Sequence, residues 1–181
     1  NLILSFSKLL NQKATHKPSA QYVLDEDYYK RIEAIQFTMT HDDGKKNEDI
    51  SKADIILLGV SRTSKTPTSI YLANRGYKTL NIPLVLDQKI PELLKKNENK
   101  FCVIGLTADP ERLSEIRKTR ANTNSNIDLK LYTNVEKIRE EVENSKLMFK
   151  KFRWPIIDVT RRSVEETAAS IIKIYEIQKS K

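Results

Sequence analysis

The chain has 181 residues, a length that fits one ordinary domain, and its 31% charged and 39% hydrophobic residues exclude a membrane protein and a largely disordered chain. The formal net charge of +8 favours anionic partners, although the lysines are too scattered for a nucleic-acid-binding face to be expected. The single cysteine, Cys102, excludes an intramolecular disulfide framework and a cysteine-built zinc site, so we expect a reducing, cytoplasmic location.

Two helices are predicted in the first part of the chain. Apolar residues in segment 2–10 indicate a short helix, and the polar sequence after it has the composition of a linker. Apolar residues at helical spacing in segment 25–39 predict a second helix, whose acidic start suits the positive end of a helix. We expect residues 1–24 to be the remnant of an N-terminal region with its linker, and residues 25–181 to form one domain.

From residue 52 onward, short apolar runs alternate with amphipathic segments. The runs cover residues 54–60, 78–85, 101–106 and 155–160, and each is too uniformly apolar for a one-sided antiparallel strand. The other segments predict helices over residues 67–75, 91–96, 109–120, 133–152 and 163–177. This alternation predicts an α/β layered domain with a mostly parallel sheet flanked by helices.

The starts of three of these helices can be located from their caps. Asp109-Pro110 places a capping carboxylate before a proline at the first helical position. The pairs Thr133-x-x-Glu136 and Ser163-x-x-Glu166 match the capping box, in which two side chains satisfy free N–H groups reciprocally.

The first predicted strand runs directly into GVSRTSKT (59–66), before a predicted helix. The phosphate-binding pattern G-x-x-x-x-G-K-[ST] is met at Gly59, Lys65 and Thr66, with Ser64 where the second glycine belongs. Serine adopts positive φ less freely than glycine, so we expect a slightly different loop shape. A strand-to-helix turn that merely holds lysine and threonine is the alternative, but spacing and context together favour phosphate binding.

In such a loop the backbone N–H groups point at phosphate oxygens, the lysine reaches the outer phosphates and the hydroxyl binds Mg²⁺. We therefore predict catalytic roles for Lys65 and Arg62 and a metal-binding role for Thr66. The residues expected to contact the nucleotide are Gly59, Val60, Ser61, Arg62, Thr63, Ser64, Lys65 and Thr66.

Four blocks of the sequence resemble one protein family. They are RIEAIQFTMTHDDG (31–44), GVSRTSKTPTSIYLANRGYKTLNIPLV (59–85), GLTADPERLSEIRKTR (105–120) and WPIIDVTRRSVEETAASI (154–171). In this order they are similar to the bacterial regulatory proteins of pyruvate, phosphate dikinase and the related phosphoenolpyruvate synthase regulators. The resemblance implies a P-loop-containing, bifunctional enzyme. Its kinase activity would use ADP to phosphorylate a threonine of the dikinase, and its phosphorylase activity would remove that phosphate with inorganic phosphate, releasing pyrophosphate.

The same resemblance implies ligands, a partner and further site residues. ADP, Mg²⁺ and inorganic phosphate are the expected ligands, and the dikinase is the expected protein partner. A homodimer is left open, and neither a membrane nor a nucleic acid is expected. The resemblance also raises the expectation that Asp42 or Asp43 orients the attacking hydroxyl or lies near Mg²⁺, where a solvated turn is the alternative. The family's usual extent implies that this chain is truncated at its N-terminus.

Other functions and residues stay open at this stage. The chain could be a nucleotide-binding regulatory module without catalysis, or a P-loop kinase of a small metabolite. Arg112, Arg117 and Arg120 could stabilise the transferred phosphate or be ordinary surface charges. The segment 158–163 could contact the adenine base by fold analogy, or Asp158 could simply satisfy backbone groups at the end of its strand.

Overall fold

The four apolar runs of the sequence form four strands of one sheet. The computed structural model describes residues 2–13, 25–42, 50–84, 90–96, 101–121 and 132–180, and the side chains of 96, 120 and 121 are outside this description. In chain order the elements are α1 (Leu2–Leu10), α2 (Glu26–Thr40), the 3₁₀ turn η2 (Ile50–Lys52), β1 (Ile55–Gly59), α3 (Lys65–Asn74), β2 (Thr79–Pro83), α4 (Glu92–Lys96), β3 (Cys102–Thr107), α5 (Pro110–Ala121), α7 (Val135–Lys151), β4 (Ile156–Asp158) and α8 (Val164–Lys179).

The strands pair in the order β2-β1-β3-β4, and each pair is parallel. Ile55 of β1 lies opposite Thr79 of β2 and Cys102 of β3, while Gly105 of β3 lies opposite Ile156. The chain leaves β1 toward β2 and leaves β3 toward β4, on the opposite side. Ligands of open parallel sheets bind at the carboxyl ends of strands where the connections diverge in this way, so the ends of β1 and β3 are the place to look for a site.

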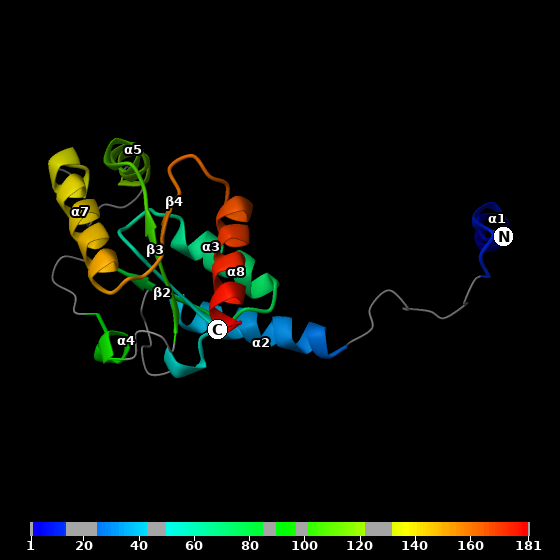
Figure 1. The fold of residues 1–181 in the computed structure, drawn as a ribbon. Coiled ribbons are helices and arrows are strands. Elements are labelled where there is room, and N and C mark those ends of the chain that lie inside the picture. Colours follow the sequence, from blue (N-terminus) through cyan, green and yellow to red (C-terminus); the bar gives the residue numbers. More distant parts are fainter. Residues whose placement is uncertain are drawn as a thin grey trace.

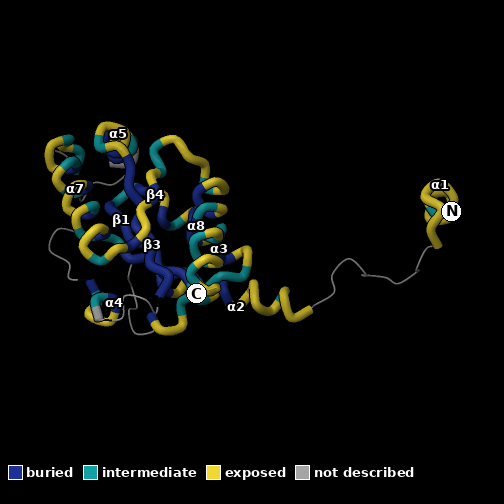
Figure 2. Tube along the Cα trace, viewed as in Figure 1, coloured by how far each residue is buried: buried dark blue, intermediate teal, exposed yellow. Residues whose placement is uncertain are grey.

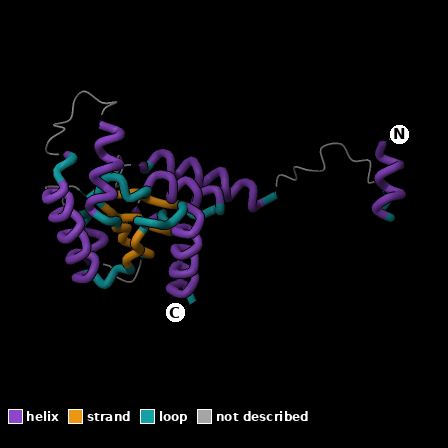
Figure 3. The backbone as a smooth tube through the Cα atoms, turned by 90° about the horizontal axis from the view of Figure 1, so that it is seen from above, coloured by secondary structure: helices purple, strands orange, loops and turns teal. Residues whose placement is uncertain are grey.

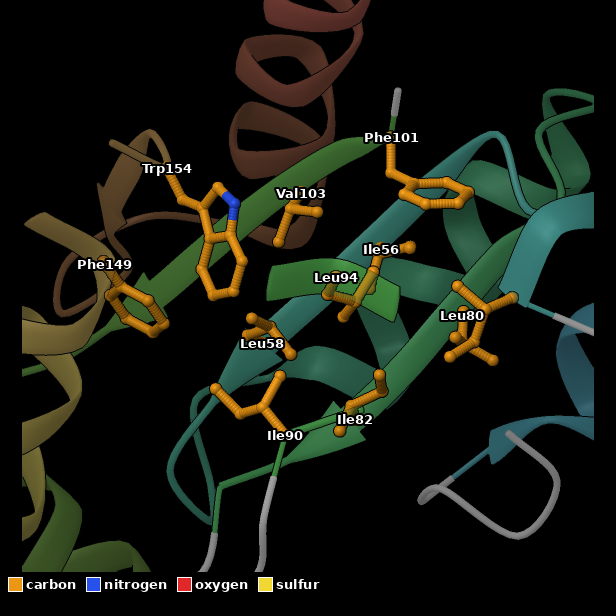
Figure 4. Packing of buried hydrophobic residues seen from close by; sticks show 11 residues of the cluster. Ile56, Leu58, Leu80, Ile82, Ile90, Leu94, Phe101, Val103, Phe149 and Trp154 are labelled. Atoms are coloured by element: carbon orange, nitrogen blue, oxygen red, sulfur yellow. The ribbon is translucent and has the colours of Figure 1, made fainter. Parts of the chain in front are cut away.

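Helices cover both faces of the sheet (Figures 1 and 3). Because side chains alternate along a strand, Ile56 and Leu58 face one layer while Ile55 and Leu57 face the other. On the first face, α4 and α7 close the core, and Figure 4 shows Phe149 among the strand residues there. On the second face, α3 and α8 pack against the strands. Figure 2 shows the strands buried between these layers, so the predicted α/β fold class is confirmed.

Helix α7 approaches strand β3 closely at Gly105. A Cβ atom on this residue would lie 2.4 Å from the ring of Phe149, a separation that carbon atoms do not adopt without displacement. Phe149 is fully buried and fills this space. The glycine therefore permits the contact that seats α7 on the sheet.

Two predictions about helix starts are corrected. Helix α3 begins at Lys65 rather than at 67, because Pro67 falls in the first turn, where a backbone N–H has no helical partner to lose. Helix α7 is capped by Asn134, whose side chain accepts from the N–H groups of Glu136 and Lys137. The capping box expected from Thr133 is therefore wrong, because Glu136 is the second helical residue and not the third.

The two other predicted caps, at Asp109 and Ser163, are confirmed, and the acidic start of α2 contains a further cap. There the side chain of Asp25 accepts a hydrogen bond from the N–H of Tyr28. Asp109 accepts from the N–H of Arg112, one turn into α5. Ser163 and Glu166 form the complete capping box of α8. These contacts satisfy N–H groups that would otherwise be free at the helix ends.

Helix α1 contains no buried residue, and Figure 1 shows it apart from the sheet. Its apolar side chains, Phe6 among them, are largely exposed. The predicted linker falls mostly in residues 14–24, outside the described residues, so the division at residue 24 stays a prediction. Within the part of the chain that the structure describes, no helix combines the length and the apolar character needed to cross a membrane.

Candidate functional site

Loop 59–66 leaves the carboxyl end of β1 and enters α3. Two of its non-glycine residues, Arg62 and Ser64, have left-handed backbone conformations with φ of 74° and 55°. Ser64 thus adopts the conformation that the glycine of the phosphate-binding pattern adopts without steric cost. A left-handed residue with a Cβ costs about 1–2 kcal/mol, so the loop keeps this shape against a local penalty.

Gly59 is required by the close approach of two neighbours. A Cβ atom here would lie 2.6 Å from the carbonyl oxygen of Leu106 and 2.6 Å from Oγ1 of Thr63. The Thr63 hydroxyl in turn donates to the carbonyl of Val60 across 2.9 Å. The first residue of the loop is therefore fixed against β3, at the divergence of the sheet connections.

Lys65 folds its side chain back over the loop. Its ammonium nitrogen donates to the carbonyl oxygen of Val60 at 2.9 Å, and the residue is only 6% exposed. The positive charge is therefore held at loop 59–66 rather than extended into solvent. An anion seated on the loop would lie close to this ammonium group.

Asp42 and Thr66 meet beside the loop, as the sequence suggested they could. Asp42 follows the end of α2, and Thr66 stands in the first turn of α3, against which α2 packs. The Thr66 hydroxyl donates to Oδ1 of Asp42 across 3.2 Å. Asp43, the other predicted carboxylate, lies outside the described residues.

Asn81 of β2 completes this cluster and was not predicted. Its Nδ2 donates to Oδ1 of Asp42 at 2.6 Å and to Oγ1 of Thr66 at 3.1 Å. Its Oδ1 is buried and has no hydrogen-bond partner among the described residues. A buried acceptor left in this state costs about 1–3 kcal/mol. The sequence did carry a signal for this residue, because an amide side chain is unusual inside an apolar run such as 78–85.

The oxygen donors of Asp42 and Thr66 suit Mg²⁺, which prefers carboxylate, hydroxyl and water oxygens. Among the described residues, no group of three or more His, Cys, Asp or Glu side chains is placed to hold a metal ion. A magnesium ion at this position would therefore depend on further ligands from nucleotide phosphates and water, as is usual for Mg²⁺ in phosphoryl-transfer sites. His41 is buried next to the cluster, with its ring stacked on Phe37.

Arg117 of α5 is a buried residue that contacts loop 59–66. It is 1% exposed, and its guanidinium donates to the carbonyl of Ser61 at 3.3 Å and to Oε2 of Glu141 at 2.7 Å. The guanidinium also lies 4.9 Å from the ring centroid of Tyr132, in a cation-π arrangement. Arg117 is thus a buried support and not a surface charge.

Tyr132 connects this support to the loop. Its hydroxyl lies 3.0 Å from Oγ of Ser61, and Nε of Arg62 donates to the same oxygen at 3.3 Å. The orientation of the predicted catalytic side chain Arg62 therefore depends on Tyr132. Neither Tyr132 nor Glu141 was predicted, because no local pattern relates them to a loop about 70 residues earlier.

The remaining candidates have simpler environments. Arg112 forms an exposed ion pair with Glu115 in its own helix, and the side chain of Arg120 lies outside the described residues. Asp158 accepts hydrogen bonds from the N–H and the hydroxyl of Thr160. Partial burial alone would raise the pKa of Asp158, but these hydrogen bonds, together with the nearby positive charges of Lys146 and Arg162, lower the pKa below its usual value. Asp158 thus satisfies groups at the end of its strand.

Comparison with known proteins gives a consistent family assignment. The family described as kinase/pyrophosphorylase matches residues 1–172. A protein of Pelagibacter ubique, provisionally named pyruvate, phosphate dikinase regulatory protein, is 67% identical over 180 residues, which are 99% of this chain and 66% of that protein. Proteins of Erythrobacter litoralis and Chelativorans with the same provisional name are 51% and 48% identical, over 92% and 93% of this chain. The matches cover 59% and 62% of those two proteins, so this chain spans about two thirds or less of its relatives' length.

Proposed function

Because this chain belongs to the kinase/pyrophosphorylase family, we propose that it is a bifunctional regulator of pyruvate, phosphate dikinase. In the kinase direction, the β-phosphoryl group of ADP moves to a threonine hydroxyl of the dikinase, and AMP leaves. In the phosphorylase direction, inorganic phosphate attacks the phosphothreonine, the threonine hydroxyl is restored and pyrophosphate leaves. Both steps transfer one phosphoryl group between oxygens.

One observation carries this proposal: Thr66 and Asp42 meet at 3.2 Å beside a loop with the phosphate-binding spacing. In kinases with such a loop, a hydroxyl of its helix and a nearby carboxylate hold the magnesium ion of the nucleotide. The bound ion would neutralise charge on the diphosphate. Thr66 and Asp42 are 24 positions apart in the sequence, and the fold brings them together beside the loop. This contact supports a nucleotide diphosphate as the ligand.

The chain's own residues supply the other requirements of phosphoryl transfer. Backbone N–H groups of residues 60–66 would cradle the diphosphate above the start of α3. The Lys65 ammonium would exchange the Val60 carbonyl for a phosphate oxygen and draw charge from the transferred group. Arg62, oriented by Tyr132, would stabilise the equatorial oxygens of the transition state.

Asp42 has a second role open to it. A carboxylate beside the transferred group can orient the threonine hydroxyl or accept its proton. In the phosphorylase direction, the attacking phosphate is itself an anion, and Lys65 and Arg62 would offset its repulsion from the phosphothreonine. Asp43, the next residue in the sequence, is the alternative carboxylate for this role.

The test is incubation of the chain with purified dikinase and ADP labelled at the β-phosphate. The expected result is label on a threonine of the dikinase, with no transfer when the dikinase is omitted. Lys65→Ala should abolish transfer, whereas Lys173→Ala, the same change at an exposed position of α8, should not. If Lys65→Ala preserves both nucleotide binding and transfer, the proposed arrangement is wrong.

A nucleotide-binding module without catalysis is the second candidate, because loop 59–66 and the contact of Thr66 with Asp42 would serve nucleotide binding alone equally well. Calorimetry separates the two candidates. Binding of ADP without transfer to the dikinase would support the module, while binding with transfer would support the enzyme. Phosphorylation of a free small acceptor by ATP would instead indicate a metabolite kinase.

A further inference from the structure

Asn81 places a buried amide between the two oxygen donors of the cluster. The residue is 1% exposed and stands in the middle of β2, opposite Leu57 of β1. Its two contacts from Nδ2 are both to oxygens predicted to serve a cation, those of Asp42 and Thr66. The amide nitrogen thus donates to two oxygen atoms that are themselves hydrogen-bonded to each other.

The two ends of this amide are unequally satisfied. Both donor contacts of Nδ2 are made, while Oδ1 has no partner among the described residues. An amide carries a donor and an acceptor of nearly the same shape, so half a turn about its last bond exchanges them. After that turn, the carbonyl oxygen of Asn81 would face Asp42 and Thr66, and three oxygens would converge.

The size of this triangle fits a hard cation. Its edges are 2.6 Å from Asn81 to Asp42, 3.1 Å from Asn81 to Thr66, and 3.2 Å from Thr66 to Asp42. Octahedral Mg²⁺ holds its ligands at 2.0–2.1 Å, so neighbouring ligand atoms lie about 2.9 Å apart. The three atoms therefore have the spacing of one octahedral face, with an N–H₂ group at the corner where an oxygen is needed.

We propose that Asn81 is a third protein ligand of the nucleotide's divalent cation and that its amide turns when the cation binds. The inference rests on the proposed function, since it takes the metal–ADP complex as the ligand. Without the cation, Nδ2 donates to both Asp42 and Thr66, which are also joined by their own hydrogen bond. With the cation, the Asn81 carbonyl oxygen faces Asp42 and Thr66, and the proton of the Thr66 hydroxyl turns away from Asp42. An oxygen lone pair of Thr66 and one of Asp42 then become available to the cation.

The first test measures the binding of Mn²⁺, a paramagnetic substitute for Mg²⁺, by electron paramagnetic resonance of the full chain with ADP. Asn81→Leu should weaken Mn²⁺ binding about 10- to 100-fold, the range typical of disturbed metal sites. Asn81→Asp, which keeps an oxygen at this position, should bind Mn²⁺ within a few-fold of the parent. Thr68→Val is the matched control, because Thr68 is buried in α3 and its hydroxyl has no partner among the described residues.

A second measurement uses the unaltered chain and so does not depend on how a variant folds. The side-chain amide signal of Asn81 in a nitrogen-15 spectrum, identified by its loss in Asn81→Asp, should shift when Mg²⁺ is added to the ADP complex. An unmoved signal, or parent-like Mn²⁺ binding by folded Asn81→Leu, would overturn the proposal.

Phosphate transfer is scored separately from metal binding. Weakened Mn²⁺ binding by Asn81→Leu, in a chain that transfers no phosphate to the dikinase, would support the role of Asn81 and contradict the proposed function. Transfer by the parent together with parent-like Mn²⁺ binding by Asn81→Leu would support the proposed function and contradict the role of Asn81. ADP binding without metal should change less than about threefold in Asn81→Leu, since the loop's N–H groups are untouched.

Discussion

The guanidinium of Arg117 donates to Oε2 of Glu141 across 2.7 Å, and this pair joins α5 to α7 beneath the loop that holds the candidate site. The Arg117 side chain is 1% exposed, while that of Glu141 is 23% exposed. Removing one partner of a buried pair leaves an uncompensated charge, which typically costs 3–5 kcal/mol. Water can reach Glu141, so the cost here should be lower than that.

We therefore expect Glu141→Gln to reduce the free energy of unfolding by about 2–3 kcal/mol. Urea denaturation followed by circular dichroism measures this change. Glu115→Gln is the matched control, because the Glu115–Arg112 pair lies on the surface and such pairs contribute about 0–1 kcal/mol. Equal midpoints for the two variants would show that the buried pair does not support the fold.

Tyr132→Phe should affect catalysis more than folding. The change removes the hydroxyl that contacts Ser61 and Arg62 but keeps the ring beside Arg117. Loss of these hydrogen bonds should cost about 1 kcal/mol of stability. Without the Tyr132 contact, Arg62 is no longer oriented, so the rate of transfer from ADP should fall about tenfold.

Affinity for ADP should change less than about threefold in this variant, because the loop's N–H groups are unaltered. Single-turnover transfer and calorimetry measure the two quantities separately. Tyr71→Phe provides the comparison, since Tyr71 also accepts from an arginine, Arg75, but on the exposed side of α3. A parent-like transfer rate in Tyr132→Phe would mean that this tyrosine does not orient Arg62.

Ser64→Gly should stabilise the protein. Ser64 has a left-handed backbone, and its side chain makes no capping hydrogen bond at the start of α3. Glycine would remove a backbone penalty of about 1–2 kcal/mol from the folded state. It would also raise the entropy of the unfolded chain, which reduces stability by about 0.4–1 kcal/mol. The net gain should be about 0.5–1 kcal/mol in a urea titration.

Ser64→Ala keeps the Cβ and should therefore bring no such gain. A gain of equal size in both variants would assign the effect to the serine hydroxyl and not to the backbone. Because the glycine of the phosphate-binding pattern stands at this position, Ser64→Gly should also preserve ADP binding.

The sheet could be predicted because its strands depend on local patterns. Each apolar run of the sequence became a strand, since a parallel sheet covered on both faces needs apolar side chains in both directions. Loop 59–66 was also predictable, because its spacing is local. The contact of Asp42 with Thr66 could only be suggested, since it depends on how α2 packs against α3.

The residues that were missed depend on tertiary contacts or on signals that are easily overlooked. Tyr132 and Glu141 reach the site across long separations in the sequence, and nothing in their neighbourhood indicates it. Arg117 was a named candidate, but its burial was not predicted, although the sequence carried a signal for it: Arg117 lies four residues after Leu113, on the buried face of α5. That spacing distinguishes it from Arg112, which lies on the exposed side.

Cys102 provides a prediction about pH. The residue is 5% exposed in β3, and burial raises the pKa of its thiol from 9.0 to about 11. Between these two values the unfolded chain loses a proton that the folded chain retains. The buried, protonated thiol of Cys102 therefore makes its full contribution to the free energy of unfolding below about pH 9. This contribution is lost as the pH rises toward 11.

Relative to Cys102→Ala, the parent should lose up to about 2 kcal/mol of unfolding free energy between pH 8 and pH 11, because one pKa unit corresponds to 1.36 kcal/mol. Urea titrations of both proteins at several pH values measure this difference, and their shared lysines and tyrosines cancel in the comparison. A thiol reagent at pH 8 should accordingly label the native chain far more slowly than the urea-unfolded chain. Equal pH dependence of the two proteins, together with rapid native labelling, would show that water reaches the thiol in the folded state.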